Sequence, residues 1–308
     1  MIFNSLTYLI FLLIVISLYW LLSYRARLIL IFTSSLIFYG FWKIEFIPIL
    51  LISVIVDWWV AQKIIQKEKN NRFFLLMLSL ATNLGLLFYF KYLIFFAEAS
   101  IGFANLIGLQ LDPIILKIIL PLGISFYTFQ TISYTVDVYR GFIKPERNFI
   151  LFACYVTFFP QLVAGPILRA KEVLPQFLNR PLFSFNFLIS GTRLILFGLF
   201  LKVVLADNIS PLVDTGFSMQ AAYLSAIDVW TLAFLFGFQI YFDFSAYSLI
   251  AIGSARMMGI IFPNNFNFPY ISSSPKDFWQ RWHISLSSWI RDYLYLPLNK
   301  IKVINRSE

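Results

Sequence analysis

The sequence contains few of the residues on which metal sites, disulfides and water-exposed surfaces depend. Only 13% of its 308 residues are charged, and it has one cysteine and one histidine. A lone cysteine cannot close an intramolecular disulfide, so Cys154, inside an apolar segment, is expected to be a small buried side chain. One histidine without cysteine partners cannot build the usual zinc sites, and no metal is expected. The sequence also lacks the GxSxG, Walker and dinucleotide-binding patterns.

Hydrophobic residues instead make up 60% of the chain, and its mean hydropathy is +0.79. Both values exceed what the core of a soluble domain needs, so they predict an integral membrane protein. A helix needs about 20 mostly apolar residues to cross a bilayer, and such stretches predict about seven to nine spans. The predicted fold class is all-α, a polytopic membrane helix bundle. The expected spans are Leu6–Leu22, Leu28–Trp42, Phe46–Ala61, Phe73–Phe96, Ile114–Val136, Phe149–Leu168, Phe185–Leu205, Ala226–Phe242 and Tyr247–Phe262.

The positive charges indicate how the chain is oriented in the membrane. The net charge of +9 is spread over short connections instead of forming one basic patch, which argues against nucleic-acid binding. Basic residues gather in alternate connections, at Arg25–Arg27, Lys63–Arg72 and Arg140–Arg147. The positive-inside rule places these connections in the cytoplasm and the N-terminus outside. Because no basic residue precedes the first apolar stretch, we expect that stretch to remain as an anchor and not to be a cleaved signal peptide.

Proline and glycine interrupt the apolar stretches in the middle of the chain. They occur in LPLGISFYTFQ (Leu120–Gln130) and FFPQLVAGPI (Phe158–Ile167). Backbone groups freed by such breaks cannot face lipid, so they must be buried in protein or line a water-filled cavity. We therefore expect one membrane domain, residues 1–308, with generic helices in 1–96 and tilted, broken helices forming the functional core in 114–262.

The segment Pro275–Pro297 differs from the apolar stretches because it mixes aromatic and charged residues. Its large apolar side chains recur every three or four residues, and charged or polar side chains fill much of the remainder. This pattern predicts an amphipathic helix that lies along the membrane interface or packs over the bundle.

Few ionisable side chains fall inside the apolar stretches, where each one is a candidate for function. Asp57 and Lys91 lie near the ends of N-terminal stretches, and we expect both to reach toward the lipid headgroups as anchors. Asp243 follows a long apolar run, and its carboxylate could hold a hydroxyl, orient a histidine or pair with Arg256. The alternative is a buried polar network that fixes helix packing.

His283, the only histidine, is the only side chain whose ordinary pKa lets it exchange protons near neutral pH. Trp279 and Trp282 precede it, and Ser287 lies one turn after it. These residues alone favour a structural histidine on an aromatic helix over a catalytic one.

Four segments together resemble the membrane-bound O-acyltransferase family, in the bacterial branch of alginate O-acetylation and teichoic acid D-alanyl transfer proteins. They are LPLGISFYTFQTISYTVDVYRG (Leu120–Gly141), FFPQLVAGPILRAKEVLPQF (Phe158–Phe177), FGFQIYFDFSAYSLIAIGSARMMG (Phe236–Gly259) and DFWQRWHISLSSWIRDYLYLPL (Asp277–Leu298). The resemblance implies transfer of an acyl group, typically acetyl, from a cytoplasmic donor such as acetyl-CoA. The acceptor it implies is a polysaccharide or partner protein outside, reached through a tunnel of tilted helices.

The resemblance places His283, in the WHISLS motif, at the first of the family's two functional histidines. A neutral imidazole suits the chemistry because it can take the proton of an acceptor hydroxyl. A supporting polar network and a set of tunnel-lining residues are expected around this histidine. The network comprises Asp243, Gln239, Tyr241, Ser245, Arg281, Ser287 and Arg291, and the tunnel candidates are Gln130, Tyr134, Gln161 and Pro166.

The family's second histidine, usually its catalytic base, belongs to a Trp-His-Gly motif that this sequence does not contain. We therefore expect a chain truncated relative to the family, whose activity on its own is open. The implied partners are membrane lipid, the acyl donor, an extracytoplasmic polysaccharide and a periplasmic transferase or acceptor protein, with no bound cofactor. The implied location is the bacterial cytoplasmic membrane. A non-catalytic remnant that binds the same partners and a transporter stay open as alternatives.

Overall fold

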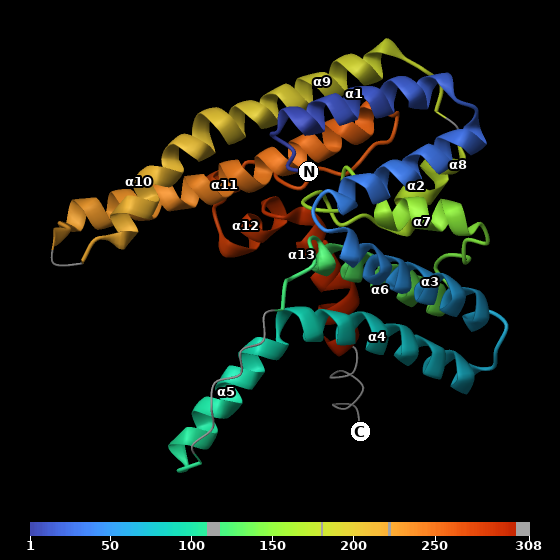
Figure 1. Cartoon of the computed structure of the whole chain (residues 1–308), viewed down its shortest axis with the longest axis horizontal. Helices are drawn as coiled ribbons and strands as arrows, with labels where there is room; N and C mark the ends of the chain where they lie inside the picture. The colour runs from blue at the N-terminus through green and yellow to red at the C-terminus, as the bar shows by residue number, and fades with distance from the viewer. Residues whose placement is uncertain (110–117, 180, 221–222, 300–308) are drawn as a thin grey trace.

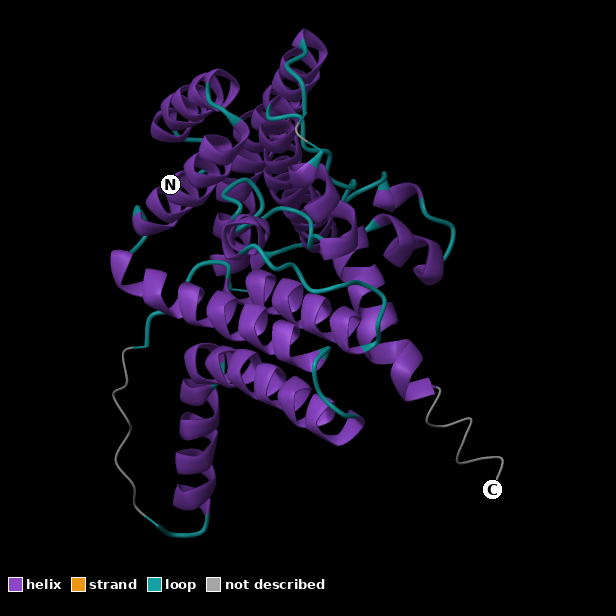
Figure 2. Cartoon of the chain, turned by 90° about the vertical axis from the view of Figure 1, so that its right-hand side faces the viewer, coloured by secondary structure: helices purple, strands orange, loops and turns teal. Residues whose placement is uncertain are grey.

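The computed structural model describes residues 1–109, 118–179, 181–220 and 223–299 (Figure 1). These residues form helices and loops and no strand, which confirms the predicted all-α class (Figure 2). The α-helices are α1 (Leu6–Leu21), α2 (Tyr24–Gly40), α3 (Ile47–Ile64), α4 (Lys69–Lys91), α5 (Leu93–Leu106), α6 (Ile124–Tyr139), α7 (Phe149–Thr157), α8 (Ala170–Leu178), α9 (Phe185–Leu199), α10 (Asp207–Ser218), α11 (Ala226–Met257), α12 (Pro275–Arg281) and α13 (Ile284–Ile290). Short 3-10 turns occupy η1 (Ile44–Phe46) and η4 (Pro269–Ile271), and π-helical turns occupy η2 (Phe200–Ala206) and η5 (Arg291–Tyr295).

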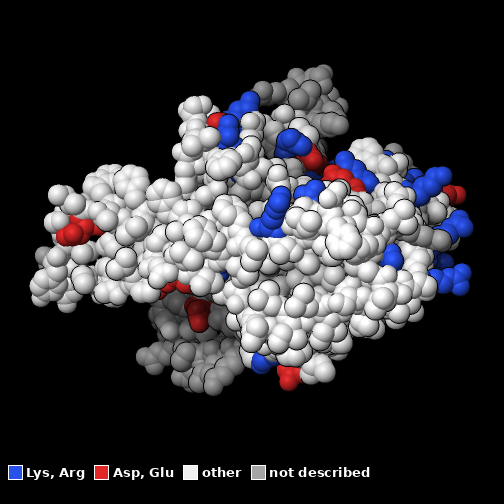
Figure 3. All heavy atoms as spheres, turned by 90° about the horizontal axis from the view of Figure 1, so that it is seen from above, with Lys and Arg blue, Asp and Glu red and all other residues white. Residues whose placement is uncertain are grey.

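Four helical segments in the described part of the chain are long and apolar enough to cross a membrane. They are Ile44–Ile64, Asn70–Lys91, Phe185–Ser218 and Ala226–Met257. Helices α1 and α5 are apolar but shorter. The outer surface carries many large exposed hydrophobic side chains, and its charges lie in small groups separated by wide uncharged areas (Figure 3). A surface of this kind suits contact with lipid, and the chain is a multi-pass membrane protein.

Two stretches predicted as separate spans, Ala226–Phe242 and Tyr247–Phe262, lie largely in one continuous 32-residue helix, α11, which ends at Met257. The prediction of two spans is wrong here because Asp243 and Ser245 lower the local hydropathy without breaking the helix. No proline or glycine lies between the two stretches, so the backbone hydrogen bonds continue through them.

The middle of the chain is broken as predicted. The stretch expected over Ile114–Val136 becomes helical only at Ile124, after Gly123 adopts a left-handed φ of 71°, and residues 114–117 lie outside the described ranges. The stretch over Phe149–Leu168 is helical only to Thr157. The two breaks meet, because a β-carbon on Gly123 would overlap the carbonyl oxygen of Leu162.

Helices α9 and α11 lie antiparallel and touch through glycines (Figure 1). A β-carbon on Gly253 would lie 2.6 Å from the carbonyl oxygen of Gly191, and one on Gly198 would lie 2.8 Å from that of Ala246. Small residues at these positions let the two backbones approach, as is usual between membrane helices. Helix α1 joins this pair through hydrogen bonds from Trp20 to the Met257 carbonyl at 3.0 Å and between the Tyr8 and Ser254 hydroxyls.

The predicted amphipathic helix over Pro275–Pro297 is divided into α12, α13 and η5. His283 separates α12 from α13, with a φ of 42°. The periodicity of the aromatic residues runs through this break, so the sequence pattern could not locate it. The backbone of the break is bonded instead to a neighbouring loop, since Asn267 donates its N–H to the Arg281 carbonyl and Ile284 donates to the Asn265 carbonyl, each at 2.9 Å.

Candidate functional site

His283 occupies a strained backbone position between two short helices. A left-handed conformation costs a non-glycine residue about 1–3 kcal/mol and persists only where the surroundings enforce it. The hydrogen bonds from the loop that carries Asn265 and Asn267 supply that enforcement. His283 is only 8% exposed, so this backbone conformation places its ring inside the protein.

A single asparagine fixes the protonation of the His283 ring. The Oδ1 atom of Asn265 accepts hydrogen bonds from the Ser285 backbone N–H at 3.3 Å and from the Ser285 hydroxyl at 2.9 Å. Its Nδ2 atom lies 3.1 Å from the Ser248 hydroxyl. Because a backbone N–H can only donate, the atom that faces it must be the oxygen, and His283 Nδ1, 3.1 Å away, must donate to it as well. The Nε2 atom therefore carries the free lone pair.

Aromatic side chains enclose the His283 ring. Phe126 stacks on it at 6.3 Å between ring centroids, and Phe244 meets it edge-on at 4.7 Å. Burial among apolar rings disfavours the charged imidazolium and lowers the pKa of His283 to about 4. At neutral pH the ring is therefore uncharged, and its Nε2 atom is able to accept a proton from a hydroxyl.

The two broken segments contact the His283 region directly. The Ser285 hydroxyl, which donates to Asn265, accepts a hydrogen bond from the Ile167 N–H at 3.0 Å. The indole of Trp289 donates to the Phe129 carbonyl at 2.8 Å. The Ile167 N–H, which lies in the break after α7, is thus satisfied by a side chain that follows His283. That the broken helices form the functional core stays a prediction.

The predicted tunnel residues are buried and partly bonded to one another. Gln161 Nε2 donates to Gln130 Oε1 at 2.7 Å, and Gln130 Nε2 donates to the Tyr155 carbonyl at 2.6 Å. The Tyr134 hydroxyl accepts the Glu146 N–H at 2.9 Å. Pro166 is buried beside Ile167. Their tunnel-lining role stays a prediction.

Asp243 forms an ion pair that the sequence analysis missed. Its carboxylate lies 2.6 Å from Lys202 Nζ, and Lys202 also contacts Asp207 at 2.8 Å. The expectations that Asp243 pairs with Arg256 or orients the histidine are wrong, because the Lys202 ammonium binds it and His283 is oriented by Asn265. Lys202 belongs to η2, whose π-helical turn brings the ammonium between the two carboxylates.

The other predicted network residues lie near His283 in sequence or space but bond locally. Arg281 pairs with Asp277 at 2.8 Å, and Arg291 pairs with Asp292 at 2.8 Å. The Ser287 hydroxyl donates to the Trp282 carbonyl at 3.2 Å.

Within α11 the remaining members also show local contacts. The Ser245 hydroxyl donates to the Phe242 carbonyl at 3.4 Å, and the Tyr241 ring lies 6.1 Å from that of Trp282. The Oε1 atom of Gln239 is buried without a hydrogen-bond partner among the described residues. Their support of the site stays a prediction.

Asp57 does not act as a headgroup anchor, contrary to the prediction. Its side chain is fully buried, and it accepts hydrogen bonds from Ser79, from Asn83 Nδ2 at 2.7 Å and from Thr135 at 3.1 Å. It joins α3, α4 and α6, because three donors on neighbouring helices replace the water that a carboxylate requires. Lys91, by contrast, is exposed at the end of α4.

Sequence reasoning missed Asn265, Ser285 and Ser248 as partners of the histidine. A usable signal for Asn265 was present, since paired asparagines between Pro263 and Pro269 are typical of a tight connection whose side chains bond the backbone. No comparable pattern marks Ser248. Across the described ranges, no group of three or more histidine, cysteine, aspartate or glutamate side chains is placed to hold a metal ion.

The chain is similar in sequence to a family of known proteins. Residues 144–307, which include His283, match the model of the membrane-bound O-acyltransferase family. The chain is 40% identical over 304 residues to the probable alginate O-acetylase AlgI of Pseudomonas putida, covering 97% of this chain and 61% of that protein. It is 38% identical over 298 residues to the peptidoglycan O-acetyltransferase of Helicobacter pylori, covering 87% and 55%.

A more distant similarity extends to a third activity. The teichoic acid D-alanyltransferase of Streptococcus thermophilus is 33% identical over 190 residues, covering 60% of this chain and 46% of that protein. The chain spans about 60% of the length of the AlgI proteins that it matches.

Proposed function

Because the chain belongs to the membrane-bound O-acyltransferase family, we propose that it carries part of the catalytic centre of an O-acetyltransferase, with His283 as a catalytic residue. The family match covers more than half of the chain and includes the WHISLS motif. The resemblance read from the sequence is thereby confirmed. The relatives act, by their names, on alginate, peptidoglycan and teichoic acid, which supports an extracytoplasmic polysaccharide as acceptor.

One observation carries this proposal, the free lone pair on His283 Nε2. Asn265 holds the proton on Nδ1, and apolar burial keeps the ring neutral. In the proposed step, Nε2 accepts the proton of an acceptor hydroxyl while the hydroxyl oxygen bonds to the carbonyl carbon of an acyl thioester. The carbon–sulfur bond then breaks, and the thiolate takes up the proton from the imidazolium.

The donor, the partners and the location complete the proposal. A cytoplasmic thioester such as acetyl-CoA would supply the acyl group, and a periplasmic transferase or acceptor protein would receive it or work beside it. The bacterial cytoplasmic membrane, with the N-terminus outside, is the proposed location. The basic connections Arg25–Arg27, Lys63–Arg72 and Arg140–Arg147 support this orientation.

Acetyl transfer in reconstituted membranes tests the proposal. Radiolabelled acetyl-CoA and a polysaccharide acceptor would be supplied to the chain and to its His283→Gln variant, which keeps the side-chain volume but removes the base. We expect transfer to fall by at least about 100-fold, within the range of a general base. Arg25→Gln, far from the site in sequence, is the control and should transfer normally.

Equal transfer by the wild type and by His283→Gln would exclude a catalytic role for His283. A chain that retains acceptor or partner binding but transfers no acetyl group would instead match the non-catalytic scaffold.

A further inference from the structure

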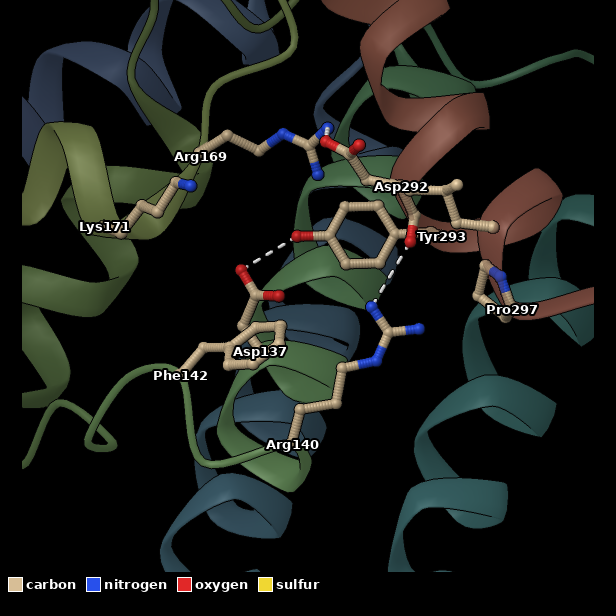
Figure 4. A pocket seen from close by; sticks show the side chains of 9 residues that line it. Asp137, Arg140, Phe142, Arg169, Lys171, Asp292, Tyr293 and Pro297 are labelled. Carbon is tan, nitrogen blue, oxygen red and sulfur yellow. Dashed lines mark hydrogen bonds and ion pairs between the residues drawn. The ribbon is translucent and has the colours of Figure 1, made fainter. Parts of the chain in front are cut away.

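A pocket of about 770 Å³ lies between the C-terminal end of α6, the start of α8 and η5 (Figure 4). It is separate from the rings that enclose His283. Its polar lining consists of Asp137, Arg140, Arg169, Lys171, Asp292 and Tyr293. Three cations thus face two carboxylates, so the lining is positively charged as a whole.

Arg169 has a hydrogen-bond donor that the protein does not use. The residue is only 7% exposed, and its Nη2 atom pairs with Asp292 at 3.3 Å. Its guanidinium also lies 4.4 Å from the centre of the Tyr293 ring. The Nη1 atom is buried and has no hydrogen-bond partner among the described residues. A buried charged donor without a partner is costly, so this atom points to an acceptor on a bound molecule.

The carboxylates of the pocket are already occupied by other groups. Asp137 accepts the Tyr293 hydroxyl at 2.8 Å, and Asp292 binds Arg291 as well as Arg169. Lys171 is exposed and has no ion pair within the described ranges. The positive charge that remains after these pairings is therefore available to an anion.

We infer that this pocket binds a phosphate group through Arg169, Arg140 and Lys171. A planar guanidinium presents two parallel N–H donors to phosphate oxygens, and a lysine adds a mobile point charge. Helix α8 begins directly after Arg169, so its N-terminal end adds a positive potential beside the same residues.

Two sources of phosphate fit this chemistry. One is a soluble acyl donor with a phosphate-bearing carrier such as coenzyme A, and the other is the headgroup of an anionic phospholipid. The donor source rests on the proposed function. It is geometrically reasonable because Asp292 follows His283 by nine residues of mostly helical chain, roughly 13 Å at about 1.5 Å per residue.

Binding measurements on the full chain test the inference without any need for catalysis. The chain would be placed in phosphatidylcholine nanodiscs and titrated with coenzyme A, and separately in nanodiscs that contain phosphatidylglycerol, with lipid retention as the readout. We expect Arg169→Gln to weaken binding of one of these probes by about tenfold or more, and Lys171→Gln to weaken it several-fold. Higher salt should weaken the same binding.

Lys171→Gln distinguishes a loss of binding from misfolding, because Lys171 is exposed and its replacement should not disturb the fold, whereas Arg169 is buried. Arg25→Gln removes an equal charge elsewhere and should leave both affinities unchanged. Loss of coenzyme A binding in the pocket variants assigns the site to a soluble donor, and loss of phosphatidylglycerol retention assigns it to lipid.

Unchanged binding of both probes in Arg169→Gln and Lys171→Gln would overturn the inference. The result is independent of the proposed function, because pocket-dependent binding of coenzyme A can occur in a chain that transfers no acetyl group. Likewise, acetyl transfer that depends on His283 but not on Arg169 would exclude the soluble donor as the source of the phosphate and leave the proposed function intact.

Discussion

At the scale of single residues, the chemistry of the site depends on what surrounds His283 more than on His283 itself. The sequence identified the histidine because no other residue has its proton chemistry. The paired asparagines mark Asn265 as part of a tight connection, but the sequence could not show that it contacts the histidine, because it is 18 positions away and is brought to the ring only by the fold. Asp57 shows the same limit, since its position near the end of its stretch suggested an anchor, whereas contacts from α4 and α6 bury it.

The lowered pKa of His283 predicts a pH dependence of stability. The folded ring has a pKa of about 4, whereas an unfolded histidine titrates near 6.5. Between these values the unfolded histidine binds the extra proton, so the contribution of His283 to stability should rise as pH increases from about 4 to 6.5 and then level off. The full effect is about 3 kcal/mol, from about 1.4 kcal/mol per pKa unit. Chemical unfolding in detergent at several pH values measures it.

His283→Gln is the matched control for this experiment, because glutamine does not titrate. The stability of the wild type relative to the variant should therefore rise between pH 4 and 6.5. A wild-type slope that persists unchanged in His283→Gln would assign the titration to another group.

At the scale of helices, the glycine contacts between α9 and α11 should limit what α11 tolerates. A β-carbon on Gly253 would lie 2.6 Å from a backbone carbonyl, so Gly253→Ala must push the two helices apart. Overpacking of this kind typically costs about 1–3 kcal/mol. We expect a lower thermal unfolding midpoint in detergent, measured by circular dichroism.

Gly237, on the same helix, provides the comparison. A β-carbon there would meet only the Tyr270 hydroxyl at 3.5 Å, an ordinary contact. Gly237→Ala should therefore leave the midpoint unchanged or raise it, since alanine favours helix. Equal destabilisation by both substitutions would contradict close packing at Gly253.

The helices themselves were predictable to different degrees. Long apolar stretches gave α1, α2 and α3 close to their observed bounds, because hydropathy reports burial in lipid directly. Hydropathy also divided α11 in two at Asp243, since it reflects the polarity of side chains and not the continuity of the backbone. The sequence pattern did not show the division at His283, because backbone hydrogen bonds with Asn265 and Asn267 impose it.

At the scale of the whole molecule, the distribution of charge makes the proposed orientation testable. The only cysteine, Cys154, is buried, so the native chain provides an almost silent background for thiol labelling. A cysteine introduced as Lys67→Cys should react with a membrane-impermeant maleimide only after the membrane is opened. Lys43→Cys, on the next connection toward the N-terminus, should react in intact cells.

Each cysteine serves as the control for the other, because Lys67 is exposed and Lys43 is partly exposed. Labelling of Lys67→Cys in intact cells, with protection of Lys43→Cys, would reverse the orientation and place Arg140 and its pocket on the outer side.

Ser285, two residues after His283, joins three parts of the molecule. Its hydroxyl donates to Asn265 and accepts the Ile167 N–H. This arrangement limits which amino-acid replacements the protein tolerates during evolution. A lineage that replaces Asn265 loses the acceptor for Ser285 and for the histidine together, so a change at one position should be followed by change at the others. Natural variation at these positions should therefore be correlated, and single replacements should be rare.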